Sequence, residues 1–437
     1  MTTTIRWAWT LLALLPLTAR ADDWPQWLGA QGDAVWKETG IIDKFPEGGP
    51  KVLWRKPVAF GYAGPAVAGD RVYVADFVTE ADVRKLNNPA SKPKVEGTER
   101  VLCLDAKTGD TIWKHEHKCE YQLSYPGGPR CAPTVSDGKV YTLGAEGNLF
   151  CLDAAKGSEL WSKDYKKDYG AKTPLWGFAG HPLVVGDKLI CIVGGQDALV
   201  VAVDKDSGKE LWKTGNAREP GYSSPVLIET GGQKQVVAWS PEGVVGYDPE
   251  TGKQAWAVEL KPHQGMAIMV PRKQGDRLFA GGMMGKSLVV KLDGEKPTEV
   301  WRGTPKTGVG PVNMTPFIEA ETIYGVDQPG FLRAVELGTG KRLWETSAPV
   351  TGAKPQGAGT AFIVKNGDRF FLFNELGELV IAKLTPEKYE EISRAKILKP
   401  TNNAFGRDVV WSHPAFAHKC MFARNDKEIV CVSLAKE

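Results

Sequence analysis

The sequence lacks several features that mark common classes of function. It has 55 basic and 52 acidic residues, so it offers no dense basic surface of the kind that nucleic acids require. No Gly-x-Ser-x-Gly elbow and no phosphate-binding glycine loop is present, and helical periodicity is nearly absent. After Leu17 no apolar run approaches the length that spans a bilayer. These absences argue against nucleic acid as a partner and against a transmembrane segment.

The first residues have the pattern of an export signal. Arg6 precedes an apolar run from Trp7 to Leu17, and Ala19-Arg20-Ala21 is a small-residue cleavage site. We therefore predict a signal peptide over residues 1–21 and an N-terminal arm over residues 22–50. No cysteine follows the cleavage site, so no lipid anchor is expected. The mature protein is predicted to be soluble and either periplasmic or extracellular.

A repeated spacing runs through most of the chain. Six times an acidic residue is followed, eight positions later, by tryptophan, and the tryptophans are 43 to 51 residues apart. The pairs are Asp105/Trp113, Asp153/Trp161, Asp204/Trp212, Asp248/Trp256, Asp293/Trp301 and Glu336/Trp344. A constant offset at this period is the signature of a repeat architecture.

Each repeat is predicted to form four short strands. A Gly turn separates the acidic residue from the tryptophan, which is typical of a β-hairpin, and two more apolar runs precede each hairpin. In addition, prolines recur eight residues before an apolar residue of the following strand, as with Pro133 and Tyr141. Proline is tolerated at the start of a strand on a sheet edge. Four strands per unit with little helix favour a β-propeller blade.

The count of units predicts an all-β, eight-bladed propeller over residues 51–437. Six units end in tryptophan, and a seventh is degenerate, with Glu391 in the tryptophan position. The eighth has three strands at the C-terminus, and Val52-Leu53-Trp54-Arg55 supplies its fourth strand from the other end of the chain. Such pairing would close the ring and hide two sheet edges. A single propeller domain and a monomer are expected.

The unit resembles the quinoprotein, or PQQ-like, propeller repeat. The best match is the segment Ala202–Trp212, which has the family order of small residue, Asp, turn, Gly, Lys and Trp. In that family the tryptophan docks on the turn of the adjacent blade. The resemblance therefore implies a blade-docking role for Trp54, Trp113, Trp161, Trp212, Trp256, Trp301 and Trp344. The opening Trp24-Pro25-Gln26-Trp27 also resembles exported PQQ-binding-like propellers of planctomycete-type bacteria.

The resemblance implies two different kinds of function. PQQ-dependent alcohol dehydrogenases carry two adjacent cysteines, a catalytic aspartate and calcium ligands, but no two cysteines are adjacent here and no catalytic residue can be transferred. The more distant outer-membrane assembly propeller lipoprotein is a scaffold without cofactor. We therefore favour a non-catalytic binding or scaffold protein with no cofactor. A PQQ-dependent oxidoreductase and a carbohydrate-binding propeller remain the alternatives, because fold does not determine function.

The spacing of the histidines, acidic residues and cysteines bears on metal and disulfide sites. His115 and His117 are two residues apart on a predicted strand, which allows a metal pair, but no third ligand is evident and a solvated face is favoured. The Asp-rich turns lack the glycine and glutamate positions of an EF-hand loop. We therefore predict no metal site. Cys119 and Cys131 flank one loop and are compatible with a disulfide.

The long connections between units are the candidate binding surface. They are rich in aromatic and amide groups, and in a propeller we expect them to converge on one face, the funnel face. The candidate residues for a protein or small-molecule ligand are Arg130, Trp176, Tyr222, Asn313, Asn403 and Arg407. Loops that cross a channel mouth need the same residue types merely to cap it, so both roles fit. His181 and His413 each start an inner strand without a nucleophile nearby. An insertion at Thr79–Thr98 is predicted to be an exposed loop.

Overall fold

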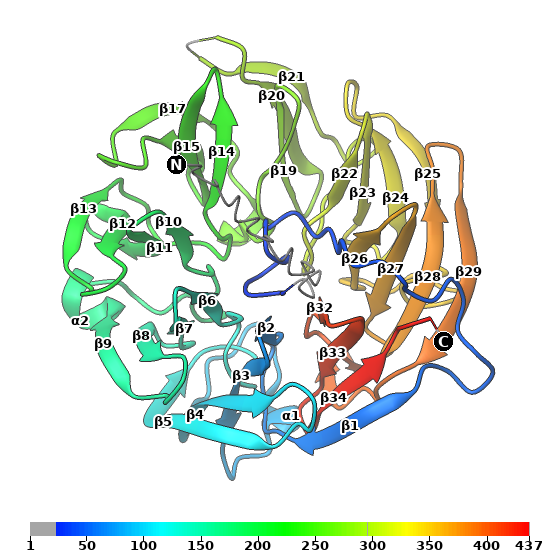
Figure 1. Ribbon diagram of the computed structural model, residues 1–437. Helices are drawn as coiled ribbons and strands as arrows, with labels where there is room; N and C mark the ends of the chain where they lie inside the picture. Colours follow the sequence, from blue (N-terminus) through cyan, green and yellow to red (C-terminus); the bar gives the residue numbers. More distant parts are fainter. Residues whose placement is uncertain (1–22, 295, 437) are drawn as a thin grey trace, which may run out of the picture.

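The computed structural model describes residues 23–294 and 296–436, and the predicted signal peptide lies outside these residues. Eight four-stranded antiparallel sheets are arranged in a ring around a central axis (Figure 1). This arrangement confirms the eight-bladed propeller. Among the described residues, no helix is both long enough and apolar enough to cross a membrane.

Blades 1 to 4 follow one another along the chain, each running from an inner to an outer strand. Blade 1 comprises β2 (Ala66–Ala68), β3 (Arg71–Val78), β4 (Lys94–Asp105) and β5 (Thr111–Gln122). Blade 2 comprises β6 (Thr134–Ser136), β7 (Lys139–Leu143), β8 (Asn148–Asp153) and β9 (Glu159–Asp164). Blade 3 comprises β10 (Leu183–Val185), β11 (Lys188–Gly195), β12 (Ala198–Asp204) and β13 (Glu210–Thr214). Blade 4 comprises β14 (Val226–Thr230), β15 (Gln233–Ser240), β16 (Gly243–Tyr247) and β17 (Gln254–Val258).

Blades 5 to 8 complete the ring. Blade 5 comprises β18 (Arg272–Gln274), β19 (Arg277–Gly282), β20 (Lys286–Lys291) and β21 (Thr298–Arg302). Blade 6 comprises β22 (Phe317–Glu319), β23 (Thr322–Val326), β24 (Leu332–Glu336) and β25 (Arg342–Thr346). Blade 7 comprises β26 (Ala361–Asn366), β27 (Arg369–Asn374), β28 (Glu378–Leu384) and β29 (Tyr389–Lys396). Blade 8 comprises β32 (Ala415–Ala417), β33 (Cys420–Arg424), β34 (Glu428–Ser433) and β1 (Val52–Pro57).

The remaining elements lie in the connections between strands. A two-stranded hairpin, β30 (Asn402–Ala404) and β31 (Arg407–Val409), lies between blades 7 and 8. The helical segments of the described chain are α1 (Val83–Leu86), α2 (Tyr165–Tyr169) and the 3₁₀ turn η1 (His263–Gly265). All are single turns, as the lack of helical periodicity predicts.

The ring closes through β1, as predicted. Val52 pairs with Val432, Trp54 with Cys431 and Pro57 with Glu428, so the N-terminal strand is the outermost strand of blade 8. Strands from both ends of the chain thus share one sheet. The inner edge of β1 pairs with β34, and the inner edge of β34 pairs with β33.

The repeated tryptophans lie between blades. Each of six indole Nε1 atoms donates a hydrogen bond to a backbone carbonyl in the turn of the next blade, at 2.8 to 3.1 Å. These are Trp54, Trp113, Trp161, Trp212, Trp301 and Trp344. Trp256 differs, because its Nε1 donates to Gln235 Oε1 of its own blade at 2.7 Å. The turn that faces it in blade 5 follows Asp293 and departs from the Thr-Gly pattern.

The N-terminal arm crosses the centre of the ring before it reaches β1 (Figure 1). Trp24 pairs with Val67 of β2, and Arg272 of β18 donates to the carbonyls of Gly32 and Asp33 on the other side of the channel. Further bridges join Val35 to Lys365 and Ile41 to Ala435. Inner strands that would present free edges to the channel are thus partly paired by the arm.

Candidate functional site

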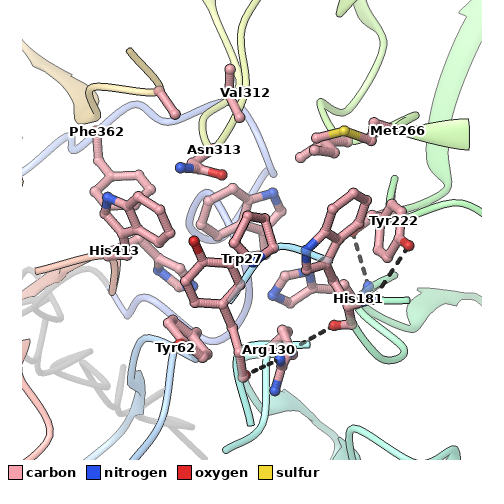
Figure 2. A pocket seen from close by; sticks show the side chains of 18 of the residues that line it. Trp27, Tyr62, Arg130, His181, Tyr222, Met266, Val312, Asn313, Phe362 and His413 are labelled. Carbon is pink, nitrogen blue, oxygen red and sulfur yellow. Dashed lines mark hydrogen bonds between the residues drawn. The ribbon is translucent and has the colours of Figure 1, made fainter. Parts of the chain in front are cut away.

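A cavity of about 230 Å³ lies at the centre of the funnel face, above the arm (Figure 2). Connections from several blades supply its walls, because each outer strand leads to the next inner strand across this face. Its lining residues are Trp27, Tyr62, Pro89, Tyr125, Arg130, Trp176, Ala179, His181, Tyr222, Ser224, Met266, Ile268, Val312, Asn313, Ala358, Phe362, Phe405, Trp411 and His413. Aromatic and aliphatic side chains predominate, and this set contains no Asp, Glu or Lys.

Trp27 of the arm forms the floor of the cavity. Its indole stacks on the His181 ring, with centroids 5.1 Å apart and planes 11° apart. The His413 ring meets the same indole edge-on at 4.1 Å. In Figure 2 both histidines lie beside Trp27 at the base of the cavity. The arm therefore contributes a side chain to the candidate site.

Both histidines at the floor are neutral. Burial lowers the pKa of His181 to about 3 and holds the pKa of His413 well below its usual value. The Gly64 N–H donates to His413 Nε2 at 3.2 Å, so this nitrogen carries no proton. His181 Nδ1 lies 3.0 Å from Ser224 Oγ, while its Nε2 has no hydrogen-bond partner in the described structure. The floor therefore has one buried nitrogen without a hydrogen-bond partner, His181 Nε2, and no charged group.

Arg130 lines the cavity, but its guanidinium is already satisfied. Its Nε donates to Trp176 O at 2.7 Å, and its two Nη atoms donate to the carbonyls of Gly128, Ser124 and Tyr125. The guanidinium carbon also lies 5.0 Å from the centre of the Tyr62 ring. Arg130 thus holds two connecting loops together. It has little hydrogen-bonding capacity left for an anionic ligand.

Trp176, Tyr222 and Asn313 form part of the walls. The Trp176 and Tyr222 rings meet edge-to-face with centroids 5.5 Å apart. The backbone N–H of Trp176 donates to the Tyr222 hydroxyl at 3.4 Å. Asn313 Nδ2 donates to Thr360 Oγ1 at 3.2 Å. These contacts join loops of different blades, so the walls are preformed.

The remaining two predicted residues lie outside the cavity. Arg407 Nε donates to Glu375 Oε1 at 2.7 Å and anchors the β30–β31 hairpin to blade 7. Asn403 lies in the same hairpin, where its carbonyl accepts from Asn87 Nδ2 at 2.9 Å. The tip of this hairpin places Phe405 at the rim, with 57% of its surface exposed.

The insertion predicted to be an exposed loop is largely exposed, and part of it contacts the rim. It contains α1, and Arg84 forms an ion pair with Asp408 at 2.6 Å. Asn87 Nδ2 also donates to Asn402 Oδ1 at 2.6 Å, and Pro89 reaches the cavity. Two polar side chains of the insertion, Arg84 and Asn87, thus hold it against the hairpin.

Sequence reasoning missed Trp27, His181 and His413 as site residues. A signal for the histidines was present, since His181, Ser224 and His413 each stand directly before a proline that precedes an inner strand. All three line the cavity. The residue before that proline therefore faces the channel in several blades. No periodic signal marks Trp27, because the arm is not part of the repeat.

The expectations for cysteine and for the histidine pair need correction. Cys119 and Cys131 are both free thiols, because Cys119 packs near Phe77 and Tyr121 while Cys131 lies in a separate core with Tyr165 and Cys191. His115 and His117 do not form a solvated face. They lie between blades 1 and 2, where both rings pack against Phe150 of β8. The ring centroids of His115 and His117 lie 4.9 and 4.8 Å from that of Phe150.

A family model described as Outer membrane protein assembly factor BamB matches residues 97–270 and 241–437. Outer membrane protein assembly factor BamB of Shewanella oneidensis is 27% identical over 164 residues. That alignment covers 35% of this chain and 40% of the relative, so the chain spans about two fifths of the length of the curated relative it matches.

Two solved structures show the same fold at low sequence identity. Quinohemoprotein alcohol dehydrogenase from Comamonas testosteroni is 14% identical with a TM-score of 0.61, and the match covers 95% of this chain and 81% of that one. A europium-containing methanol dehydrogenase is 14% identical with a TM-score of 0.60, covering 94% and 89%. Likeness at this identity concerns architecture alone.

Proposed function

This chain belongs to the family of the outer membrane protein assembly factor BamB, whose members are PQQ-like propellers, and we propose that it is an exported, non-catalytic binding protein. In this proposal it recognises a partner protein through the funnel face. An apolar side chain of the partner enters the central cavity, and the exposed Phe405 at the rim adds to the contact.

The observation that carries the proposal is the chemistry of the cavity lining. A preformed, mainly aromatic cavity with few free polar groups favours an apolar ligand. A cavity of about 150 Å³ is enough to hold a benzene ring, so 230 Å³ accommodates a large apolar side chain. Buried aromatic anchors of this kind often dominate the binding energy of protein interfaces.

The lining residues do not fit PQQ. PQQ is a quinone with three carboxylates, and it would need free cations for its carboxylates and oxygen ligands for calcium. Arg130 is the single Arg or Lys side chain of the lining, and backbone carbonyls already accept from its nitrogens. The lining contains no carboxylate that could serve as a calcium ligand or general base. This mismatch supports a binding role over an oxidoreductase.

Site-specific cross-linking tests the proposal. A photoreactive side chain at Phe405 should capture a discrete protein from the native envelope, whereas the same group at Leu160, exposed on the outer strand β9, should not. Ala179→Trp, which fills the cavity, should abolish the Phe405 product while leaving the fold intact. Equal capture at both positions would contradict the proposal.

An activity assay addresses the two alternatives. With PQQ and calcium added, the purified protein should show no dye-linked oxidation of alcohols or sugars, and a glycan array should show no binding. Turnover that Ala179→Trp abolishes would favour the oxidoreductase instead. Binding of one glycan that is lost in the same variant would favour a carbohydrate-binding propeller.

A further inference from the structure

A second cluster of chemically active side chains lies between blades 1 and 2, away from the funnel cavity. His115, His117 and Cys119 alternate along β5 and so share one face of the strand. Glu99 of β4 is the direct cross-strand partner of His117. One ligand atom each from Glu99, His117 and Cys119 lie within 4.8 Å of one another. Three donors from two paired strands therefore converge on one point.

The donor atoms of this cluster are incompletely satisfied. Within the described residues, the Nε2 atoms of both His115 and His117 are buried without a hydrogen-bond partner. His117 Nε2 lies 3.6 Å from Glu99 Oε2, which is too long for a hydrogen bond. Orphaned buried nitrogens of this kind are costly and call for an explanation.

The space beside these donors has the size of a single ion or water. A cavity of about 10 Å³ is lined by Glu99, His115 and His117, by Arg100, which is paired with Asp76, and by Gly144 and Phe150 of blade 2. Cys119 is not part of this lining, although its Sγ lies within 4.8 Å of the donor atoms of Glu99 and His117. This volume is about the minimum that one water-sized sphere occupies. A larger ligand is excluded, whereas a metal ion bound directly by side chains fits.

Electrostatics also favour a cation here. Glu99 is buried, with 4% of its surface exposed, and His117 is partly buried beside it. Tyr121 Oη and the Ala145 N–H donate to Glu99 Oε1, which holds the carboxyl in place and leaves Oε2 for another partner. A dication would offset the desolvation of the carboxylate.

We propose that Glu99, His117 and Cys119 bind one divalent cation of the zinc class between blades 1 and 2. Mixed oxygen, nitrogen and sulfur ligation is typical of Zn²⁺ and excludes Ca²⁺ and Mg²⁺, which take oxygen ligands. On binding, the Cys119 thiol loses its proton and coordinates as a thiolate. The ion links β4 and β5, two adjacent strands of blade 1, on the side where the His117 ring packs against Phe150 of blade 2.

Cobalt and zinc titrations of the full-length protein test this site. Co²⁺ should bind with a stoichiometry of one and give the thiolate-to-cobalt charge-transfer band, and Zn²⁺ should displace it. Zinc at one hundred times its Kd should raise Tm by about 3 °C, whereas Ca²⁺ should have no effect. Cys119→Ser should lose the band, and His117→Ala should weaken zinc binding by more than about 100-fold.

Matched variants separate a specific site from adventitious binding. Cys103→Ala removes a buried cysteine of the same sheet, and His263→Ala removes an exposed histidine, so both should retain the band. Glu99→Gln keeps the shape of the side chain and should weaken zinc binding even if His117→Ala fails to fold. Absence of a charge-transfer band in the wild-type protein, or a band that persists in Cys119→Ser, would overturn the proposal.

Discussion

At the junction between blades 2 and 3, Trp161 lies against Gly208, and its indole Nε1 donates to Lys205 O at 3.1 Å. At the junction between blades 7 and 8, Glu391 occupies the tryptophan position and accepts instead from Tyr389 Oη at 2.6 Å. No hairpin turn faces Glu391 in blade 8, because β34 and β1 come from opposite ends of the chain.

The N-terminal arm takes the place of both missing parts at the second junction. The Phe45 N–H donates to Ser393 Oγ of β29 at 3.0 Å, and Ile41 pairs with Ala435 after β34. Trp36 packs between Phe371 of blade 7 and Phe416 of blade 8. The comparison shows that a repeat contact can be lost where a segment outside the repeat buries equivalent apolar surface.

The largest expected effect is on the arm. Trp36 is 1% exposed, so Trp36→Ala should lower the free energy of unfolding by about 3–5 kcal/mol, in the same range as Trp161→Ala. Equilibrium urea unfolding measures both. Leu160→Ala, at an exposed neighbour of Trp161, should cost at most about 0.5 kcal/mol. If Trp36→Ala cost less than about 1 kcal/mol, the arm would be an accessory and not a structural substitute.

A glycine pair isolates the docking contact itself. Gly157 has φ 73°, and a Cβ there would lie 2.4 Å from the Trp113 ring; Gly186 has φ 61° with nothing within 4 Å. Both alanine variants pay the left-handed backbone cost of about 1–2 kcal/mol. Gly157→Ala should cost about 1–3 kcal/mol more, because the indole must move. The same urea experiment measures the difference, and equal losses would show that the turn tolerates displacement of the indole.

The fold was predictable because its signal is local and repeated. Asp204 and Trp212 fix one hairpin, and the same offset in other blades fixes the ring. The cavity was only partly predictable. Trp27 comes from a non-periodic segment, and it meets His181 and His413 only after the ring has closed. The same limit applies to Glu99 beside Cys119, because strand register, which is not visible in spacing alone, brings them together.

The smallest expected effect is a pH dependence at the beginning of the arm. His418 Nε2 lies 3.9 Å from Asp23 Oδ1, and this carboxylate, with Glu38 and Cys420 nearby, raises the pKa of His418 above its usual value. Because the folded-state pKa is raised, the stabilisation is complete below the unfolded pKa of about 6.5 and is lost as pH rises through the folded pKa. The pair is partly exposed, so the loss should be under about 1 kcal/mol.

Unfolding free energies at about pH 5.5 and pH 8 measure this loss in the wild-type protein and in His418→Asn. Asparagine suits the left-handed backbone at this position, where φ is 55°, and it removes the titrating group. The difference between the two proteins should therefore shrink toward pH 8, as the wild-type imidazole loses its proton. A difference that stays constant with pH would mean that His418 holds the arm through packing, and the junction would then rest on apolar burial alone.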